Sequence, residues 1–161
     1  MFVYIARHAW AGHYGDEGDW ADDSERPLTR EGIERYRRVL ARLRHAGMQP
    51  RSIATSPYVR CRQTADLVAE VCGGTVEEVE ALALGAELEP LLRWTAGCDA
   101  GDVCWVGHNP DVGRLAALLI GHGDSGIRFA KGSVAAVQFY GDVSPGIGEL
   151  NWHTTAKLLG E

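Results

Sequence analysis

The chain has 161 residues, of which 45% are hydrophobic and 24% charged, and its formal net charge is −6. These values are typical of one soluble globular domain, spanning residues 1–161, and they exclude an intrinsically disordered chain. The negative charge argues against a general nucleic-acid binder, because such proteins neutralise phosphates with an excess of lysine and arginine.

The apolar segments and the cysteines indicate the compartment. The longest purely apolar interior stretch, residues 115–120, is far shorter than the ~20 residues of a membrane span. A secretory signal is not expected, because the N-terminal segment lacks a basic region and reaches Arg7 before an apolar region can develop. The four cysteines form no CxxC pair. We therefore expect a cytoplasmic protein with reduced thiols and no membrane or nucleic-acid partner.

Strands are predicted in short segments that are rich in β-branched or aromatic residues and bounded by turn formers. In chain order these segments are residues 2–6, 52–55, 75–79 and 103–107. Two further strands, joined by a turn, are expected at residues 133–140 and 149–155.

Helices are predicted between these strands. Apolar residues at helical spacing follow the first strand, with Thr29 as the expected N-cap and Gly47 as the C-terminal stop. Ser56 and Asn109 each precede a proline, a pattern typical of a cap followed by the first helical turn, so helices are expected to start there. The alternation predicts an α/β fold: a single three-layer domain, with a mostly parallel sheet, helices on both faces and an antiparallel C-terminal edge.

Basic side chains follow three of the predicted strands. Arg7 and His8 follow the first, Arg60 lies one turn into the helix after the second, and His108 follows the fourth. Ligands of open α/β sheets bind beyond the carboxyl ends of the strands, so these groups are expected to converge. Two guanidinium groups, two imidazoles and nearby helix N-termini favour a dianion, and we expect a phosphoryl group.

Other candidate residues carry weaker signals. The remaining histidines are expected to be structural or solvated, and they are His13, His45, His122 and His153. The long segment 10–27 has aromatic residues that could line the site, namely Trp10, Tyr14 and Trp20. Its acidic residues either discourage polyanionic substrates or are simply solvated, and they include Asp16, Glu17, Asp22 and Asp23. The arginines of the first helix either form a solvated face or dock an acidic protein.

Four segments resemble a known family. The stretch "ARHA" at 6–9 is similar to the RHG signature of the histidine phosphatase superfamily, the phosphoglycerate mutase-like proteins. The segments "ERPLTREG" at 25–32, "TSPYVRCRQTA" at 55–65 and "VGHNP" at 106–110 resemble, in order and spacing, those of short SixA-like phosphohistidine phosphatases. The resemblance covers nearly the whole chain.

By this resemblance, His8 corresponds to the nucleophile, Arg7 and Arg60 to the arginines that hold the phosphoryl group, and His108 to the second histidine of the site. It also implies a phosphohistidine enzyme intermediate and neither a metal nor another cofactor. The residues are consistent with this chemistry, since a neutral imidazole can attack phosphorus and cations can stabilise the equatorial oxygens. His8 needs a partner on its other ring nitrogen, which the sequence does not identify.

A general acid is not evident in the sequence. Larger members of the superfamily resemble one another in carrying a carboxylic acid after the third strand, and the corresponding residue here is Ala81. Glu80 is one position away and is expected on the opposite face, while Glu87 and Glu89 could still reach the site.

We therefore expect a metal-independent phosphatase that dephosphorylates phosphohistidine on a protein. Two alternatives remain. The substrate could be a small phosphorylated metabolite, or the site could bind a phosphorylated ligand without turning it over.

Overall fold

Six strands form one sheet in the part of the chain that the computed structural model describes, which is residues 1–12, 20, 22–121 and 126–161. They are β1 (Phe2–Arg7), β2 (Ser52–Thr55), β3 (Thr75–Glu78), β4 (Val103–Gly107), β5 (Val134–Gln138) and β6 (Glu149–Thr154). Their order across the sheet is β3-β2-β4-β1-β5-β6. All six lie where strands are predicted, with ends that differ by no more than two residues.

Strands β1 to β4 are parallel. β4 lies between β1 and β2, and β2 pairs with β3. β5 runs antiparallel to β1, and β6 runs antiparallel to β5. The predicted mostly parallel sheet with an antiparallel C-terminal edge is therefore confirmed. Because β1, β4 and β2 are adjacent and parallel, the residues that follow them meet at one edge of the sheet.

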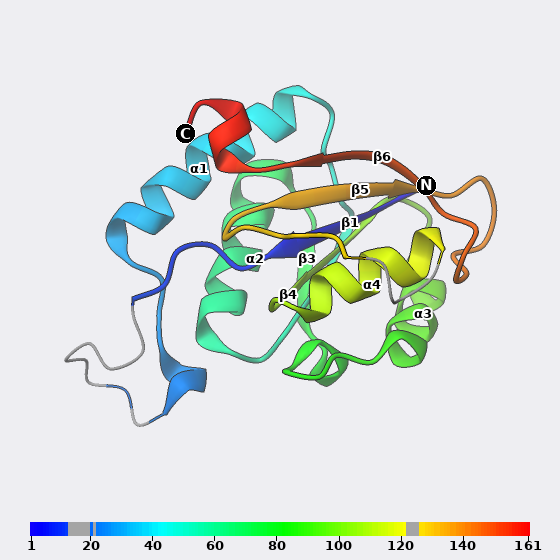
Figure 1. Cartoon of the computed structure of the whole chain (residues 1–161), viewed down its shortest axis with the longest axis horizontal. Coiled ribbons are helices and arrows are strands. Elements are labelled where there is room, and N and C mark those ends of the chain that lie inside the picture. Colours follow the sequence, from blue (N-terminus) through cyan, green and yellow to red (C-terminus); the bar gives the residue numbers. More distant parts are fainter. Residues whose placement is uncertain (13–19, 21, 122–125) are drawn as a thin grey trace.

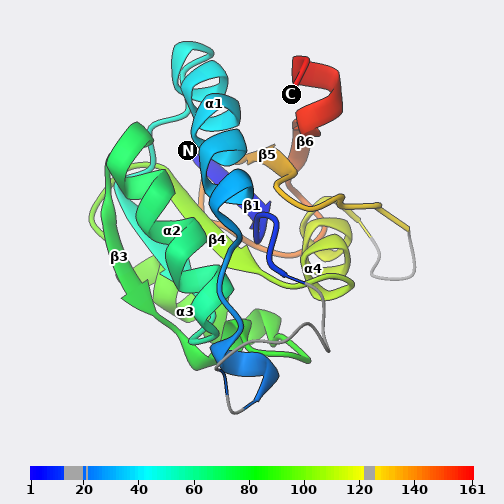
Figure 2. The same cartoon turned by 90° about the vertical axis from the view of Figure 1, so that its left-hand side faces the viewer.

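Two pairs of helices cover the two faces of the sheet within the described residues (Figures 1 and 2). α1 (Arg30–His45) and α2 (Val59–Cys72) lie on one face, and α3 (Leu88–Gly97) and α4 (Asp111–Ile120) lie on the other. The predicted three-layer α/β fold is confirmed. α3 is not among the predicted helices. Its Pro90 lies in the first turn, where proline is compatible with a helix. None of these helices is long and apolar enough to cross a membrane.

β1 illustrates how the sequence divides the interior into two cores. Tyr4 and Ala6 pack in the core beneath α1 and α2, whereas Val3 and Ile5 pack in the core beneath α3 and α4. All four are buried, because successive side chains of a strand point to opposite faces and both faces of this sheet are covered. Burial of a side chain of the size of Ile5 contributes about 2 kcal/mol. The strand that ends at the site is therefore held firmly from both sides.

The start of α1 is tied to the residues that follow β1. The hydroxyl of Thr29 accepts a hydrogen bond from the amide of Gly32 at 3.0 Å, which confirms the predicted N-cap. The amide of Thr29 donates to the carbonyl of Trp10 at 2.9 Å, and Ala11 forms a β-bridge with Leu28. The residues at the two ends of segment 12–27 are thus fastened together.

The predicted caps of the two following helices are wrong. The N-cap of α2 is Tyr58 and that of α4 is Pro110, so Ser56 and Asn109 lie outside both helices. The Ser56 hydroxyl lies 2.9 Å from Nε2 of His108 and accepts from the amide of Tyr58 at 3.4 Å, before α2 begins. The Ser56 side chain belongs to the polar cluster at the sheet edge instead.

Replacement of Gly32 by alanine is expected to destabilise the fold, although alanine normally favours a helix. A Cβ atom there would overlap the carbonyl oxygen of Trp10 and lie 2.9 Å from the hydroxyl oxygen of Thr29. We expect Gly32→Ala to lower the free energy of unfolding by about 1–3 kcal/mol in urea titrations. Gly97→Ala is the control, since open space surrounds Gly97, and it should be neutral or stabilising by up to about 1 kcal/mol. Equal effects of the two substitutions would contradict the contact.

Candidate active site

Backbone hydrogen bonds fix the residues that follow the strands. Arg7 is the last residue of β1 and lies opposite Gly107, the last residue of β4. The amide of His8 donates to the carbonyl of Gly107 at 3.0 Å, and the amide of Ser56 donates to the carbonyl of Val106 at 3.1 Å. The N–H group of Ser56 is therefore used within the sheet.

The four predicted site residues lie in one cluster. The ring centroids of His8 and His108 are 5.5 Å apart, with their planes inclined by 61°. Nη2 of Arg60 lies 3.4 Å from Nδ1 of His108. Arg7 is close enough for its charge to lower the pKa of both imidazoles. Three strand ends thus bring two guanidinium groups and two imidazoles together.

The His8 ring has a defined tautomer. Its Nδ1 lies 2.8 Å from the carbonyl oxygen of Ala9, which can only accept a hydrogen bond, so Nδ1 carries the proton. Burial, together with the charges of Arg60, His108 and Arg7, lowers the pKa of His8 to about 3, although the Ala9 carbonyl opposes this shift. At neutral pH the ring is therefore uncharged and Nε2 holds a lone pair. The partner that the sequence leaves unidentified is the Ala9 carbonyl.

His108 has the opposite tautomer. Its Nδ1 faces the Arg60 guanidinium, which can only donate, so in the neutral ring the proton is on Nε2 and is donated to the Ser56 hydroxyl. Burial and the Arg60 charge lower the pKa of His108 to about 4, with a smaller contribution from Arg7 and an opposing one from Asp111 and Asp23. The Tyr58 ring packs edge to face against the His108 ring, with the two ring centroids 4.8 Å apart.

Asp23 holds Arg60 in place. Nη1 of Arg60 donates to the Asp23 carbonyl at 2.6 Å, and Nη2 donates to Oδ2 of Asp23 at 2.9 Å. The other carboxylate oxygen of Asp23 accepts from Nε of Arg26 at 2.8 Å. Burial opposes ionisation of Asp23, but its hydrogen bonds and its charge interactions with Arg26 and Arg60 keep its pKa below the ordinary value. Asp23 is therefore an ionised bridge between two arginines.

Five buried side-chain nitrogen or oxygen atoms have no hydrogen-bond partner in the described part of the chain, and two of these belong to the arginines of the site. They are Nε of Arg7 and Nε of Arg60. Nη1 of Arg7 donates to the Phe129 carbonyl at 2.8 Å, so this guanidinium has a neutral partner and keeps its full charge. Burial lowers the pKa of Arg7 from its ordinary value. Unpaired buried donors beside two cations favour an anion at this position.

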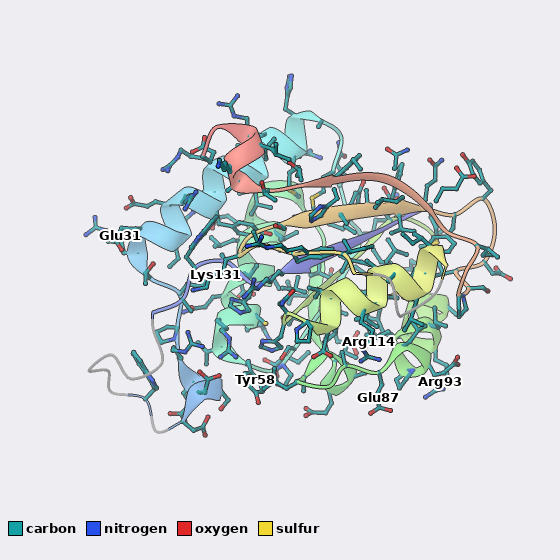
Figure 3. The ribbon with its side chains drawn as sticks, viewed as in Figure 1. Glu31, Tyr58, Glu87, Arg93, Arg114 and Lys131 are labelled. Carbon is teal, nitrogen blue, oxygen red and sulfur yellow. The ribbon has the colours of Figure 1, made fainter. Side chains whose placement is uncertain are left out.

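The acid candidates lie apart from this cluster. Glu80 is exposed in the 3-10 helix η2 (Glu80–Leu82), and Ala81 packs against the core beneath α3 and α4. Glu87 and Glu89 are exposed at the start of α3, and Glu87 projects from the lower edge of the molecule in Figure 3. In the described residues none of these three carboxylates forms a hydrogen bond or ion pair with the histidines or arginines of the site.

The other predicted residues are distributed elsewhere. His13, Tyr14, Asp16, Glu17 and His122 lie outside the described residues. His45 is exposed, and His153 in β6 stacks near Phe129. Trp20 is half-buried, and Asp22 caps the 3-10 helix η1 (Asp23–Glu25). Within the described residues, no group of three or more histidine, cysteine or carboxylate side chains is arranged to hold a metal.

Three arginines of α1 contact neighbouring parts of the chain. Arg37 forms an ion pair with Glu70 of α2, and Arg38 forms one with Glu161. Arg35 donates to the Glu161 carbonyl and stacks over the Trp10 ring at 4.1 Å. These contacts favour the structural interpretation of this charged face over a docking surface.

Sequence reasoning missed three side chains that support the site. They are Asp23, Ser56 and Thr64, whose hydroxyl donates to the Arg60 carbonyl at 2.6 Å and accepts from the Ala9 amide at 3.0 Å. Ser56 and Thr64 lie within the segment "TSPYVRCRQTA" that the resemblance highlights, which was the available signal. Asp23 precedes the "ERPLTREG" segment by two residues and gave no signal of its own.

Comparison with known proteins agrees with this geometry. The family model of the histidine phosphatase superfamily (branch 1) matches residues 3–83, a range that includes Arg7, His8 and Arg60. An uncharacterized protein of Picosynechococcus sp. is 35% identical over 165 residues, covering 99% of this chain and 94% of that protein. The chain belongs to the histidine phosphatase superfamily.

Solved structures of the superfamily share the whole fold. The protein histidine phosphatase SixA, solved with tungstate, superposes with a TM-score of 0.82 at 27% identity, covering 99% of both chains. The α-ribazole phosphatase of Shigella flexneri superposes with a TM-score of 0.68 at 17% identity, covering 97% of both chains, and shows the likeness of fold. The family and the SixA likeness support a phosphatase.

The lowered pKa values of His8 and His108 predict a loss of stability in mild acid. In the unfolded chain both rings bind a proton near pH 6.5, whereas in the folded chain they do so only near pH 3 and pH 4. The unfolded state therefore binds more protons as the pH falls below 6.5. We expect the free energy of unfolding to decrease by about 1 kcal/mol per pH unit for each histidine between pH 6 and pH 4.5.

Urea unfolding at several pH values checks this slope. His8→Asn removes one of the two titrating groups while its amide can still donate to the Ala9 carbonyl, so the slope should decrease. His45→Asn is the control, because His45 is exposed at the end of α1, and it should keep the wild-type slope. A His8→Asn variant with the wild-type slope would show that His8 is not held neutral by the fold.

Proposed function

We propose that the protein is a metal-independent phosphatase that transfers a phosphoryl group first to His8 and then to water, and that its substrate is phosphohistidine on a protein. The hydrogen bond from Nδ1 of His8 to the Ala9 carbonyl carries the proposal, because it leaves the lone pair on Nε2. Membership of the superfamily and the likeness to SixA support it. So does the tungstate in the SixA structure, since tungstate is a tetrahedral oxyanion like phosphate.

In the first step, Nε2 of His8 attacks the phosphorus atom in line with the leaving group. A bond forms between Nε2 and phosphorus, and the bond from phosphorus to the leaving group breaks with its electron pair. Nδ1 keeps its proton throughout, and the Ala9 carbonyl stabilises the positive charge that develops on the ring. In the second step, water attacks phosphorus and the Nε2 lone pair is restored, while the proton of water passes to the released phosphate or to solvent.

The cations stabilise the charge on the transferred group. Nε of Arg7 and Nε of Arg60 offer unused donors to its oxygens, and Asp23 can remain on the two terminal nitrogens of Arg60. A bound dianion also raises the pKa of His108, which can then donate from both ring nitrogens. Phosphoryl transition states are loose, so positioning and charge stabilisation of this kind supply most of the catalysis.

The leaving group favours phosphohistidine over an alkyl phosphate. By the resemblance, Ala81 corresponds to the position of the acid in larger relatives, and Glu80, Glu87 and Glu89 are exposed. An alkoxide needs a general acid to depart, which contributes about 10² to 10⁴ in rate. An imidazole that carries a proton leaves as a neutral molecule and needs no such help. The site is therefore suited to phosphoramidates.

A small phosphorylated metabolite remains the second candidate substrate. The observation that favours it is the fold shared with the α-ribazole phosphatase of Shigella flexneri, which shows that this architecture is compatible with a phosphatase of another substrate. A module that binds a phosphorylated ligand without turnover is the third possibility. Release of phosphate from phosphohistidine, from p-nitrophenyl phosphate and from alkyl phosphates distinguishes the three.

His8→Asn is expected to abolish turnover while the fold is retained. Asparagine can donate to the Ala9 carbonyl, but it offers no nucleophile, so kcat should fall by more than about 10³-fold. Rapid quenching of the wild type with radiolabelled substrate should trap a phosphoenzyme that is labile to acid and stable to base, as expected for phosphohistidine. His45→Asn should form it normally. If the His8→Asn variant still became labelled, the nucleophile would be a residue other than His8.

Phosphohistidine is expected to be a better substrate than an alkyl phosphate by at least about 10²-fold in kcat/KM, because the carboxyl groups of Glu80, Glu87 and Glu89 are exposed and form no bond to the described residues of the site. The measurement compares phosphohistidine, p-nitrophenyl phosphate and glycerol phosphate with the wild type and with Glu80→Gln, Glu87→Gln and Glu89→Gln. None of the three substitutions should change the ranking. Equal turnover of the alkyl phosphate, lost on one glutamine substitution, would identify that glutamate as an acid.

Chelation is expected to leave the activity intact. Two arginines beside the nucleophile repel a divalent cation and themselves supply the positive charge that a metal would provide. Phosphate release should therefore continue in EDTA, and vanadate should inhibit by adopting the five-coordinate geometry of the transferred group. Loss of activity in EDTA that zinc or manganese restores would identify a metallohydrolase.

A further inference from the structure

A turn that precedes β5 is fastened to the candidate nucleophile. The Phe129 carbonyl accepts from the side chain of Arg7 at 2.8 Å, and the Ser133 carbonyl accepts from the amide of Arg7 at 3.0 Å. The amide of Gly132 donates to the carbonyl of His8 at 3.1 Å. Lys131 lies between these anchor points, so the backbone holds it beside the carboxyl end of β1, where Figure 3 shows it.

The packing of Gly132 keeps the turn in this position. Gly132 has a φ of +70°, and a Cβ atom there would lie 2.9 Å from the ring of Trp10 and 3.2 Å from that of Tyr36. Gly132 is buried, whereas Lys131 is half-buried, so the turn rests on the aromatic side chains and leaves the lysine accessible. The location of Lys131 is therefore a fixed property of the fold.

The Lys131 ammonium has no acidic partner in the described part of the chain. The carboxylate of Asp23 already bonds Arg26 and Arg60, and that of Asp111 bonds Arg114. Burial lowers the pKa of Lys131, and the charges of Arg7 and Arg26 lower it further. A phosphoryl dianion held by Arg7 and Arg60 would leave Lys131 as an unused cation at the edge of the site.

We propose that Lys131 binds a second anionic group of the substrate, a carboxylate or a phosphate carried by the leaving group. This inference rests on the proposed function, because it takes His8 as the point where the phosphoryl group is transferred. It narrows the substrate class to molecules with a negative charge near the scissile phosphoryl group, either an acidic residue next to phosphohistidine or an anionic group on a small molecule.

Matched substrates test the proposal. One pair is N-acetyl-phosphohistidine, with a free carboxylate, and its neutral methylamide. The other is 3-carboxyphenyl phosphate and 3-carbamoylphenyl phosphate. The readout is the ratio of kcat/KM for the charged member to that for the neutral member. For at least one pair, the charged-to-neutral ratio of kcat/KM should be about tenfold higher in the wild type than in Lys131→Met, which is a typical effect of one charge pair. The change should lie mainly in KM.

Control variants separate this role from others. Lys157→Met is the matched control, because Lys157 is the chain's other lysine and is exposed in the 3-10 helix η3 (Ala156–Leu159), and it should keep the wild-type ratio. Lys131→Arg should restore most of it. If Lys131→Met lowers kcat/KM for both members by the same factor, the lysine acts on the scissile phosphoryl group and the proposal is wrong. Unchanged ratios in both pairs would also overturn it.

Equilibrium binding distinguishes failure of this proposal from failure of the proposed function. Calorimetry with 3-carboxybenzyl phosphonate and 3-carbamoylbenzyl phosphonate requires no turnover. If the wild-type protein hydrolyses none of the substrates but binds the carboxylate analogue about tenfold more tightly than Lys131→Met does, the proposed phosphatase activity is contradicted and the proposed subsite is supported. If the wild type turns over phosphohistidine but binds the carboxylate analogue no more tightly than Lys131→Met does, the phosphatase activity is supported and the subsite is contradicted.

Discussion

Burial of His8 and His108 beside the charges of Arg7 and Arg60 is the constraint on which the site depends. Burial first, and then the guanidinium charges, lower the pKa of both imidazoles, so each ring is uncharged at neutral pH. An uncharged His8 ring keeps the lone pair that a nucleophile needs. Asp23 offsets part of the positive charge, yet it does so by bonding Arg60 and Arg26 and forms no bond to the imidazoles. A dianion would complete the charge balance, so the site is electrostatically suited to an oxyanion.

The fold can hold these groups together because they follow strands that are buried on both faces. Arg7 ends a strand whose side chains are buried on both faces, and His108 follows the strand beside it. The Thr64 hydroxyl joins the Arg60 carbonyl to the Ala9 amide, which links α2 to the segment after β1. Cations that would otherwise move apart are therefore held by backbone hydrogen bonds and core packing, and the stability of the cores offsets the cost.

The sequence predicts all six strands and three of the four helices of the described residues, because most of these elements carry a local signal. Short β-branched segments mark the strands, and Thr29 marks the start of α1. The convergence of four site residues follows from parallel strands ending at one edge. The sequence cannot predict bonds that depend on tertiary placement. Ser56 has the local pattern of a helix cap, but its hydroxyl forms a hydrogen bond with His108. The partner of His8 is a backbone carbonyl, which has no sequence signature, and Asp23 was indistinguishable from the acidic residues around it.

The bridge between Ala11 and Leu28 has an evolutionary consequence. Because it closes segment 12–27 at its base, the length of that segment can change without moving β1 or α1. Doubling the length of such a loop costs only about 0.6 kcal/mol in closure entropy. Asp23 belongs to this segment and contacts Arg60, so variation there alters the surroundings of one cation and leaves His8 unchanged. Substitutions around Asp23 would therefore change how Arg60 is held, while the backbone hydrogen bond that orients the His8 ring stays in place.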